Sequence, residues 1–370
     1  MKIAIVGAGA AGLMCACMLD VEHTVVVFDK NESVGKKLLL TGNGRCNLTN
    51  LVSSEEFLES IPQGREFLKH SIGEFTPNDT IKFFNKLGVE TIVESDNRVF
   101  PKQGKANGVR QALEDYARAR GVEFRFDSAV ADVVRKGEVF EIMVDGFVSE
   151  QFDAVIIATG GVSFPSTGST GDGYEIASKL GHKIVSPRPA LCGLQFETTT
   201  GFQGIGVRAR VTLGGNSEVG NAMFTKNGIG GPLIFKLSSL FGEGSVEGEM
   251  LNVDFVPDIE RPIFDVKDKP FYAFRKHLPQ NVANWLVGLG MKPKDIKNVR
   301  IKIKDFEPIE IATVTRGGVC ISEINPETME SKHVQNLFFI GEVIDVDGLS
   351  GGFNLQIAFS TAVVCARSIR

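Results

Sequence analysis

The first twelve residues limit the possible folds of this chain more than any other stretch. Residues 2–6, Lys-Ile-Ala-Ile-Val, form an apolar, largely β-branched run that predicts a buried strand. Three glycines follow with the spacing G-x-G-x-x-G, at Gly7, Gly9 and Gly12, and small residues through Leu19 predict a helix. In such a turn the glycines permit a tight bend, close approach of a pyrophosphate and close helix–strand packing, respectively. The pattern predicts that a dinucleotide binds at the helix N-terminus, whose N–H groups and dipole attract phosphate.

A second strand and an acidic residue follow in the expected order. Thr24–Phe28 is rich in valine and is followed directly by Asp29, a position from which a carboxylate can accept hydrogen bonds from ribose hydroxyls. The three glycines alone are a weak signal. Together with both strands, the helix and the terminal acid they predict an α/β fold with a Rossmann-like domain.

Residues 35–50 are too rich in glycine and asparagine to predict a regular element. Gly42 and Gly44 permit positive φ angles or close approach to the backbone, and Arg-Cys-Asn at 45–47 contributes a cation, a thiol and an amide. A loop of this kind, shortly after the ribose-binding strand, can lie along a bound dinucleotide. A structural turn with a capping asparagine is the alternative interpretation.

Two later strands also run into glycines. The apolar run 154–157 continues into Ala-Thr-Gly-Gly at 158–161, and Asn336–Ile340 leads into the glycine-rich segment 341–356. A helix is predicted from Phe353 to Ser368, and its N-terminal dipole could stabilise negative charge on a reduced flavin ring. The chain has no second G-x-G-x-x-G, so we predict no Rossmann-type site for a separate NAD(P).

The intervening segments predict several helices and one polar turn. In the turn at 97–106 the basic side chains either meet an anion or only face solvent; these are Arg98, Lys102 and Lys105. Helices are predicted at Ser54–Phe67, Pro77–Leu87 and Ala106–Arg120.

The character of the sequence changes after Pro187. Short β-like runs separated by glycine turns suggest a small antiparallel sheet or barrel. Phe271–Leu289 predicts a helix and Ile309–Val314 a strand. We therefore predict two domains: a nucleotide-binding domain at 1–190 plus 316–370, and an inserted, β-rich substrate domain at 191–315 with a helical part at about 271–290.

Charge and hydropathy exclude some classes of protein. The net charge of −5 gives no global signature of nucleic-acid binding. The basic run Lys292–Lys304 is a local exception, which is either a solvated face or a surface for a polyanion. No apolar run approaches the length that spans a bilayer. Since the glycine motif follows the first residues directly, we expect no signal peptide and a cytoplasmic protein.

Cysteine and histidine spacing predicts neither a redox dithiol nor a metal site. The six cysteines form no C-x-x-C or C-x-x-x-x-C, and the five histidines form no H-x-x-x-H. We expect reduced and mostly buried thiols, and no metal centre.

The whole chain resembles a known family of flavoproteins. The segments that carry the resemblance are 7–12, 35–50, 98–105, 158–173, 315–332 and 341–356, of which G-N-G-R-C-N and G-G-x-N-L-Q are the most specific. They resemble the YhiN/BaiN-type FAD-binding flavoproteins, also called the aminoacetone oxidase family or NAD(FAD)-utilising dehydrogenases. The resemblance implies a three-layer, Rossmann-like FAD-binding domain interrupted by a β-barrel-like domain with a small helical part.

The resemblance also implies a set of cofactor-binding residues. The glycine turn would hold the pyrophosphate, Asp29 the adenosine ribose, the backbone at 129–130 the adenine, and the later segments the flavin. The full set is Gly7, Gly9, Ala10, Ala11, Gly12, Asp29, Lys30, Lys36, Lys37, Gly42, Asn43, Gly44, Arg45, Cys46, Asn47, Ala129, Val130, Ala158, Thr159, Gly160, Gly161, Gly341, Glu342, Asp347, Gly352, Phe353, Asn354 and Leu355. Candidate proton donors are Cys46, Asp345 and Asp347, although a structural role is the alternative for each.

The implied function is that of an FAD-dependent oxidoreductase. NADH or NADPH would donate hydride by docking transiently, and a small-molecule substrate would lie between the flavin and the inserted domain. The reaction would reduce an activated C=C bond or oxidise a small amine. Reduction of uracil in ribosomal RNA, with RNA as the partner, and a non-enzymatic, redox-responsive flavoprotein are the alternatives. No membrane contact and no obligate protein partner are expected.

Overall fold

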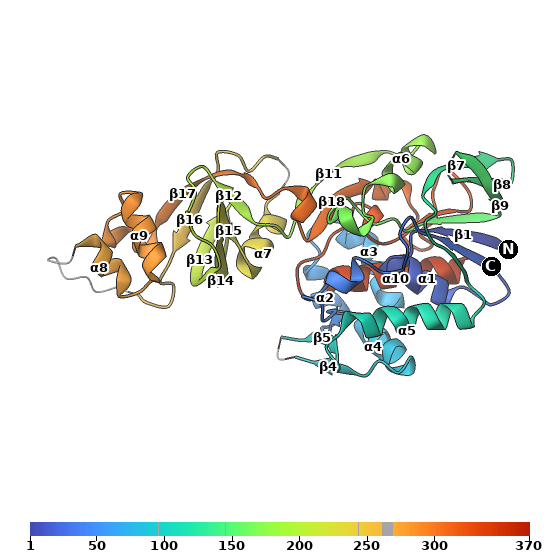
Figure 1. The fold of residues 1–370 in the computed structure, drawn as a ribbon, viewed down its shortest axis with the longest axis horizontal. Coiled ribbons are helices and arrows are strands. Elements are labelled where there is room, and N and C mark those ends of the chain that lie inside the picture. Colours follow the sequence, from blue (N-terminus) through green and yellow to red (C-terminus); the bar gives the residue numbers. More distant parts are fainter. Residues whose placement is uncertain (95, 145, 243, 261–268) are drawn as a thin grey trace. The chain divides into compact units, whose positions relative to one another are not determined.

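The computed structural model describes residues 1–94, 96–144, 146–242, 244–260 and 269–370 (Figure 1). Its internal contacts divide the chain into two compact units. The first consists of Met1–Arg188 with Val314–Arg370, and the second of Pro189–Thr313.

The first unit is built on a five-stranded parallel sheet with the order β19-β10-β1-β2-β6. The central strands are apolar along their length because both faces of the sheet are covered, as is usual for parallel sheets. Ile3, Ile5 and Ile156 have no exposed surface. The strands are β1 (Lys2–Val6), β2 (Thr24–Phe28), β6 (Glu123–Arg125), β10 (Ala154–Ile157) and β19 (Leu337–Phe339).

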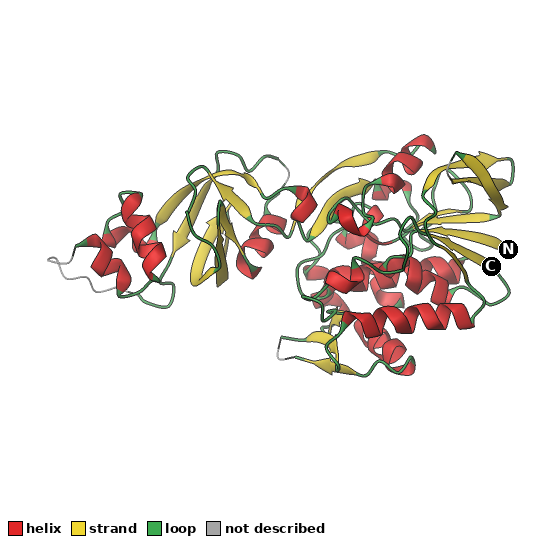
Figure 2. Ribbon diagram, viewed as in Figure 1, coloured by secondary structure: helices red, strands yellow, loops and turns green. Residues whose placement is uncertain are grey.

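Helices cover one face of this sheet and an antiparallel meander covers the other (Figure 2). α1 (Ala10–Met18) packs against α10 (Phe353–Ser368), so the first and last helices of the chain are neighbours. On the opposite face, Phe152 meets Phe28 edge to face, with ring centroids 5.8 Å apart. The remaining helices are α2 (Ser54–Glu59), α3 (Arg65–Glu74), α4 (Pro77–Lys86), α5 (Ala106–Ala119) and α6 (Asp172–Lys179), and the meander consists of β7 (Val130–Lys136), β8 (Val139–Val144) and β9 (Phe147–Phe152).

Two small sheets complete the first unit. One is three-stranded with the order β3-β5-β4, and the other pairs β11 with β18. Their bounds are β3 (Thr49–Asn50), β4 (Thr91–Val93), β5 (Arg98–Pro101), β11 (Ile184–Ala190) and β18 (Val314–Val319). Among the described residues, no helix is both long enough and apolar enough to cross a bilayer.

The second unit contains a closed barrel with the strand order β12-β15-β14-β13-β16-β17. In β13 buried and exposed residues alternate, which is the pattern of a strand with one face toward a core. Its bounds are β12 (Leu194–Phe196), β13 (Ile205–Leu213), β14 (Asn216–Thr225), β15 (Gly228–Gly230), β16 (Met250–Asp254) and β17 (Val299–Phe306), with α7 (Pro232–Leu240), α8 (Pro270–Arg275) and α9 (Gln280–Gly288). The predicted fold class, a Rossmann-like domain interrupted by a β-barrel, is confirmed.

Two predicted helices are each broken into two. The helix predicted at 54–67 is interrupted between α2 and α3, where Pro62 and the left-handed Gly64 (φ 83°) lie. The helix predicted at 271–289 is interrupted at Pro279, which precedes α9 in an extended conformation. Because proline lacks an N–H and restricts the residue before it, apolar periodicity across these positions overestimated helix length.

Two further local predictions are wrong. The polar turn predicted at 97–106 contains strand β5, which pairs with β3 and β4. Val99 and Phe100 in this strand are buried, so tertiary packing outweighs the polar neighbours. The strand predicted at 309–314 is a 3₁₀ turn over Ile309–Ile311, and the strand begins only at Val314.

Candidate functional site

The glycine turn has the geometry of a phosphate cradle. Gly7 has a φ of 106°, and a Cβ there would lie 2.5 Å from the Ala158 carbonyl oxygen, so this position requires glycine. A Cβ on Gly12 would lie 1.9 Å from the Gly7 carbonyl oxygen. A Cβ on Gly9, by contrast, would meet nothing within 4 Å. Gly9 is also the N-cap of α1 and provides no side-chain cap, so the N–H groups of the first turn, which include those of Ala10 and Ala11, have no capping side chain.

Asp29 supports this turn from the end of β2. Its Oδ2 accepts the Ala8 N–H at 2.7 Å, and its Oδ1 accepts the Asn31 backbone N–H at 2.8 Å. An ionised carboxylate has about four acceptor positions, so Asp29 retains capacity for a ribose hydroxyl. The Ser128 N–H donates to the Asp29 carbonyl at 2.9 Å, which brings the segment containing Ala129 and Val130 to the same strand end.

The loop 42–47 adopts an unusual backbone conformation. Gly42, Asn43, Gly44 and Cys46 all have positive φ angles, between 56° and 80°. A left-handed backbone is rare for a residue with a side chain, and strain of this kind clusters at functional sites. The loop is therefore fixed in a conformation that the sequence indicated only through its glycines.

Two buried polar atoms in and beside this loop have no hydrogen-bond partner among the described residues. They are the Asn47 Oδ1 and the Thr49 Oγ1. Buried polar groups are satisfied in the great majority of cases, and an exception calls for a specific explanation. A ligand that offers donors and acceptors here would satisfy both atoms.

Lys37 and Glu342, far apart in sequence, form an ion pair. The Lys37 Nζ lies 2.8 Å from the Glu342 Oε2 and donates to the Ser163 Oγ at 2.6 Å. The Thr315 N–H donates to the Glu342 Oε1 at 2.9 Å. The Thr315 hydroxyl in turn accepts the Ser163 N–H at 3.1 Å. This network joins four of the segments that carry the family resemblance, and Ser163 and Thr315 were not among the predicted site residues.

Glycines also bring the other predicted segments together. A Cβ on Gly341 (φ 73°) would lie 2.7 Å from the Ala11 Cβ, so this turn lies against the first turn of α1. A Cβ on Gly161 would lie 2.4 Å from the Thr315 Oγ1. A Cβ on Gly352 (φ 101°) would lie 2.5 Å from the carbonyl oxygen of Thr49. Gly352 is the N-cap of α10, which also has no side-chain cap. The strand ends at Ala158 and Gly341 thus lie against the predicted cradle, and the N-terminus of α10 lies against Thr49.

Some predicted cofactor residues have their side chains engaged elsewhere. The Arg45 guanidinium pairs with Glu94 at 2.6 Å and stacks over Phe100, 4.0 Å from its ring centroid. Lys30 forms an ion pair with Asp172. Among the other predicted residues, the Lys36 Nζ lies 3.7 Å from the Glu32 Oε1, and Asn354 hydrogen-bonds both the N–H and the carbonyl of Gly348.

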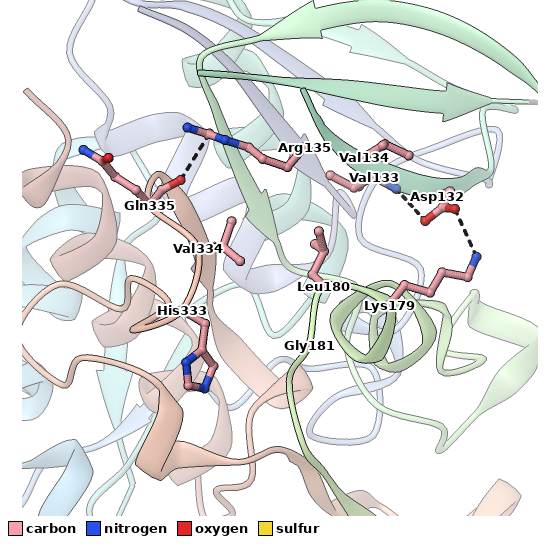
Figure 3. Close-up of a pocket in the computed structure, with 10 residues that line it drawn as sticks. All are labelled: Asp132, Val133, Val134, Arg135, Lys179, Leu180, Gly181, His333, Val334 and Gln335. Carbon is pink, nitrogen blue, oxygen red and sulfur yellow. Dashed lines mark hydrogen bonds and ion pairs between the residues drawn. The ribbon is translucent and has the colours of Figure 1, made fainter. Parts of the chain in front are cut away.

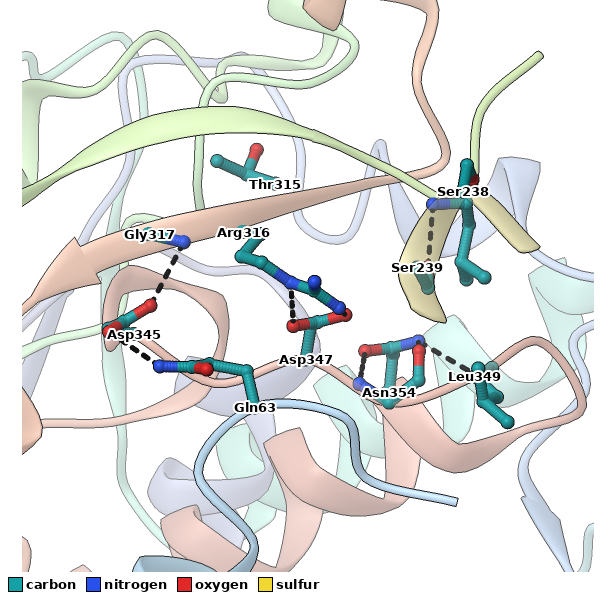
Figure 4. A network of polar contacts seen from close by, with 12 residues as sticks. Gln63, Ser238, Ser239, Thr315, Arg316, Gly317, Asp345, Asp347, Leu349 and Asn354 are labelled. Atoms are coloured by element: carbon teal, nitrogen blue, oxygen red, sulfur yellow. Dashed lines mark hydrogen bonds and ion pairs between the residues drawn. The ribbon is translucent and has the colours of Figure 1, made fainter. Parts of the chain in front are cut away.

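The two predicted acids lie in a buried polar network (Figure 4). The Asp347 carboxylate accepts two hydrogen bonds from the Arg316 guanidinium, at 2.6 and 2.7 Å. Asp345 accepts the Gly317 N–H and the Gln63 amide, both at 3.1 Å. Burial raises the pKa of both carboxyl groups, and Arg316 opposes that shift. Arg316 and Gln63 were not predicted, because only the fold brings them to these acids.

Cys46 is completely buried, and burial raises the pKa of its thiol to about 12. Burial has the same effect on Cys17 and Cys192. A thiol of this kind holds its proton at neutral pH, and the role of Cys46 as a proton donor stays a prediction. All six cysteines are free, and Cys320 is the one that is partly exposed.

We predict that a thiol reagent added to the native protein reacts rapidly with one cysteine, Cys320. All six should react after denaturation. Titration with a chromogenic disulfide before and after denaturation measures the number of reactive thiols in the native and in the denatured protein. Cys320→Ser should remove the rapid phase. Two or more rapid thiols in that variant would contradict the burial described here.

Comparison with known proteins places the whole chain in one group. The family profile described as "HI0933-like protein Rossmann domain" matches residues 1–368. A protein of Haemophilus influenzae named ribosomal RNA dihydrouridine synthase is 32% identical, over 99% of this chain and 97% of its own. A Clostridium scindens protein named 3-dehydro-bile acid delta(4,6)-reductase is 31% identical, over 99% and 98%.

Solved structures show the same fold at low identity. The 3-ketosteroid delta1-dehydrogenase of Sterolibacterium denitrificans superposes with a TM-score of 0.55 at 12% identity, over 99% of this chain and 98% of that one. A quinol fumarate reductase chain of E. coli superposes with a TM-score of 0.54 at 15% identity, over 99% and 69%. These likenesses concern the fold.

Proposed function

Because the chain belongs to the HI0933-like Rossmann family, we propose that it is an FAD-dependent oxidoreductase that reduces an activated C=C bond with hydride from NADH or NADPH. The observation that carries this proposal is the open cradle at Gly9, beside an uncapped helix N-terminus. The two unpartnered polar atoms of Asn47 and Thr49 support it, because they require a ligand with hydrogen-bonding groups.

Each part of the cofactor has a group suited to hold it. The pyrophosphate would bind at Gly9 and the first turn of α1, and the adenosine ribose at Asp29. The flavin would lie near the loop 42–47 and the N-terminus of α10, whose positive end favours an electron-rich ring. When bound, FAD supplies the redox chemistry; the protein binds it, orients it and excludes water.

The two named relatives support reduction of a C=C bond as the reaction class. One is named for dihydrouridine synthesis in ribosomal RNA and the other as a bile acid delta(4,6)-reductase. Each name describes saturation of a conjugated double bond, and their nearly equal identity to this chain favours neither substrate.

A specific observation keeps RNA as the second candidate substrate. On β17 the exposed positions alternate and are occupied by Arg300, Lys302 and Lys304. Lys302 pairs with Glu197 at 2.8 Å, whereas Lys297, in the preceding turn, pairs with Asp254 at 3.0 Å. Arg300 and Lys304 therefore remain the members of this strand face best placed to contact phosphate.

The test of the proposed function is an anaerobic half-reaction. The purified protein should be yellow, and NADH or NADPH should bleach the oxidised flavin. A conjugated enone or ribosomal RNA, added next, should restore the colour and so identify the acceptor. A colourless protein that takes up no FAD would overturn the proposal. Bleaching by an amine and by neither nucleotide would replace it with an amine oxidase.

A double variant on β17 tests whether RNA is the substrate. Arg300→Glu combined with Lys304→Glu reverses two exposed charges on β17. If RNA is the substrate, reoxidation by RNA should slow and depend less steeply on salt, while reoxidation by a small enone stays unchanged. Equal loss with both acceptors would instead indicate damage to the protein.

A further inference from the structure

Three chain segments that lie far apart in sequence meet at one cluster of metal-ligating side chains. His182 follows α6, Glu323 ends a 3₁₀ turn over Ile321–Glu323, and His333 lies in the loop before β19. One donor atom from each lies within 4.8 Å of the other two. Sequence spacing could not indicate this cluster, because His182 lies far from Glu323 and His333 along the chain.

Backbone hydrogen bonds hold the three segments in place. The Lys183 N–H donates to the Glu323 Oε2 at 2.9 Å, and the Lys332 N–H donates to the Glu323 carbonyl at 2.9 Å. The Cys320 N–H donates to the Lys183 carbonyl, also at 2.9 Å. The three segments and the Glu323 carboxylate are thus held in place before any ligand binds, which lowers the cost of binding.

The distances from the carboxylate to the two histidines fit a small tetrahedral ion. The His182 Nδ1 and the His333 Nε2 lie 3.2 and 3.6 Å from the Glu323 Oε2. Bonds of 2.0–2.1 Å in a tetrahedron place ligands about 3.3 Å apart. The separations therefore match two edges of a zinc coordination sphere.

The buried ring of His182 provides a second, independent observation. Its side chain has no exposed surface, and its Nδ1 lies 3.2 Å from the Glu323 Oε2 without the angle of a well-formed hydrogen bond. The other ring nitrogen, Nε2, lies 2.8 Å from the Ser331 Oγ, and the ring meets Phe339 edge to face. Metal-bound histidines commonly use their second nitrogen in this way, to fix the ring.

We propose that His182, Glu323 and His333 bind one Zn²⁺ ion through Nδ1, a carboxylate oxygen and Nε2. Imidazole with a single carboxylate suits zinc, whereas Mg²⁺ prefers an octahedron of oxygens. The fourth position would be taken by water, because His333 is half exposed. His333 also lines a pocket of about 780 Å³ together with Val334 and Gln335, open to solvent (Figure 3).

The site lies beside β19. His333 precedes this strand, and the His182 ring packs against Phe339 at its end. A bound ion would clamp three segments of the first unit together.

A particular ring tautomer is required. The Ser331 Oγ already accepts the N–H groups of His333 and Val334, at 3.0 and 2.9 Å. Without metal, the serine proton can point to Nε2 and leave the ring proton on Nδ1, toward Glu323. Zinc at Nδ1 requires that proton on Nε2, and the Ser331 Oγ can accept it only if it releases one of these two N–H groups. The competing arrangement is therefore a metal-free Ser–His–Glu hydrogen-bond chain.

The test is zinc titration of the FAD-loaded protein after treatment with a chelator. Calorimetry should show one Zn²⁺ per chain at micromolar concentration and no binding of Mg²⁺. Zinc should raise the Tm by several degrees, because it binds only the folded state. His333→Ala and Glu323→Gln should each weaken zinc binding by at least about 10-fold.

His70→Ala is the matched control, since His70 is an exposed histidine in a different element, α3. It should bind zinc as the parent protein does. Absence of zinc binding by the parent protein would overturn the proposal and leave the hydrogen-bond chain. Equal binding by His333→Ala would overturn it as well. Flavin absorbance should be unchanged in all variants, so this test is separate from that of the proposed function.

Discussion

Gly9→Val should remove bound FAD and leave the fold of the protein intact. The valine side chain would occupy the open space in front of α1, and Gly9 has a φ of −78° and a ψ of −167°, which valine tolerates. Loss of two charge-assisted hydrogen bonds to phosphate costs about 3 kcal/mol or more. FAD affinity should therefore fall by at least about 100-fold, as measured by fluorescence titration of the apoprotein.

The neighbouring Gly12 provides the contrast. A Cβ at Gly12 would lie 1.9 Å from the Gly7 carbonyl oxygen, so Gly12→Ala forces the helix away from the strand. Overpacking of this kind costs about 1–3 kcal/mol and sometimes more, and it should appear as a lower unfolding midpoint of the apoprotein. Gly9→Val should cost no more than about 1 kcal/mol, since valine is a poorer N-cap than glycine. Full FAD retention by Gly9→Val would mean that the cofactor lies elsewhere.

Asp347→Asn should destabilise the protein strongly. Asp347 has no exposed surface and Arg316 is 6% exposed, so the substitution removes the negative charge that accepts two hydrogen bonds from a buried guanidinium. Removal of one partner from a buried ion pair costs about 3–5 kcal/mol. Urea unfolding of the apoprotein, followed by far-UV circular dichroism, measures this loss.

Two further variants test this explanation. Arg316→Met combined with Asp347→Leu should recover much of the lost stability, because an apolar pair of similar size is tolerated where a single charge is not. Lys69→Met removes the exposed ion pair between Lys69 and Glu66 and should change stability little. If Asp347→Asn were as stable as the parent protein, the pair would be solvated and Asp347 would again be a candidate proton donor.

Local sequence patterns predicted the elements whose packing follows from their own residues. β1, β2 and α10 have the predicted bounds, and the three glycines at 7–12 lie where the motif places them. Each is either a mainly apolar segment or contains a glycine that a close approach of the backbone requires. Breaks inside helices were missed where a proline or a left-handed glycine interrupts an otherwise apolar pattern, as at Pro62, Gly64 and Pro279.

The sequence predicted which segments form the candidate site. It predicted less well which partners their charged side chains contact. The backbone of Gly341 approaches Ala11 and that of Gly352 approaches Thr49, because glycines mark close approaches of the chain. Lys37 and Arg45 both looked like cofactor ligands, yet Lys37 pairs with Glu342 and Arg45 with Glu94. Charged side chains form ion pairs with residues that are distant in sequence. A single sequence does not show which acidic residue the fold brings near a given lysine or arginine.

The second unit is inserted in the middle of the sequence of the first, which has a consequence for biosynthesis. The parallel sheet needs β19 to cover β10, and α1 needs α10, but both arrive only after residue 313. A ribosome adds about 5–20 residues per second, so the nascent chain holds an uncovered strand and helix face for about 10 seconds or more. The barrel is complete by then and can fold first. Chaperone capture of stalled nascent chains should therefore be strongest for chains that end between residues 190 and 336.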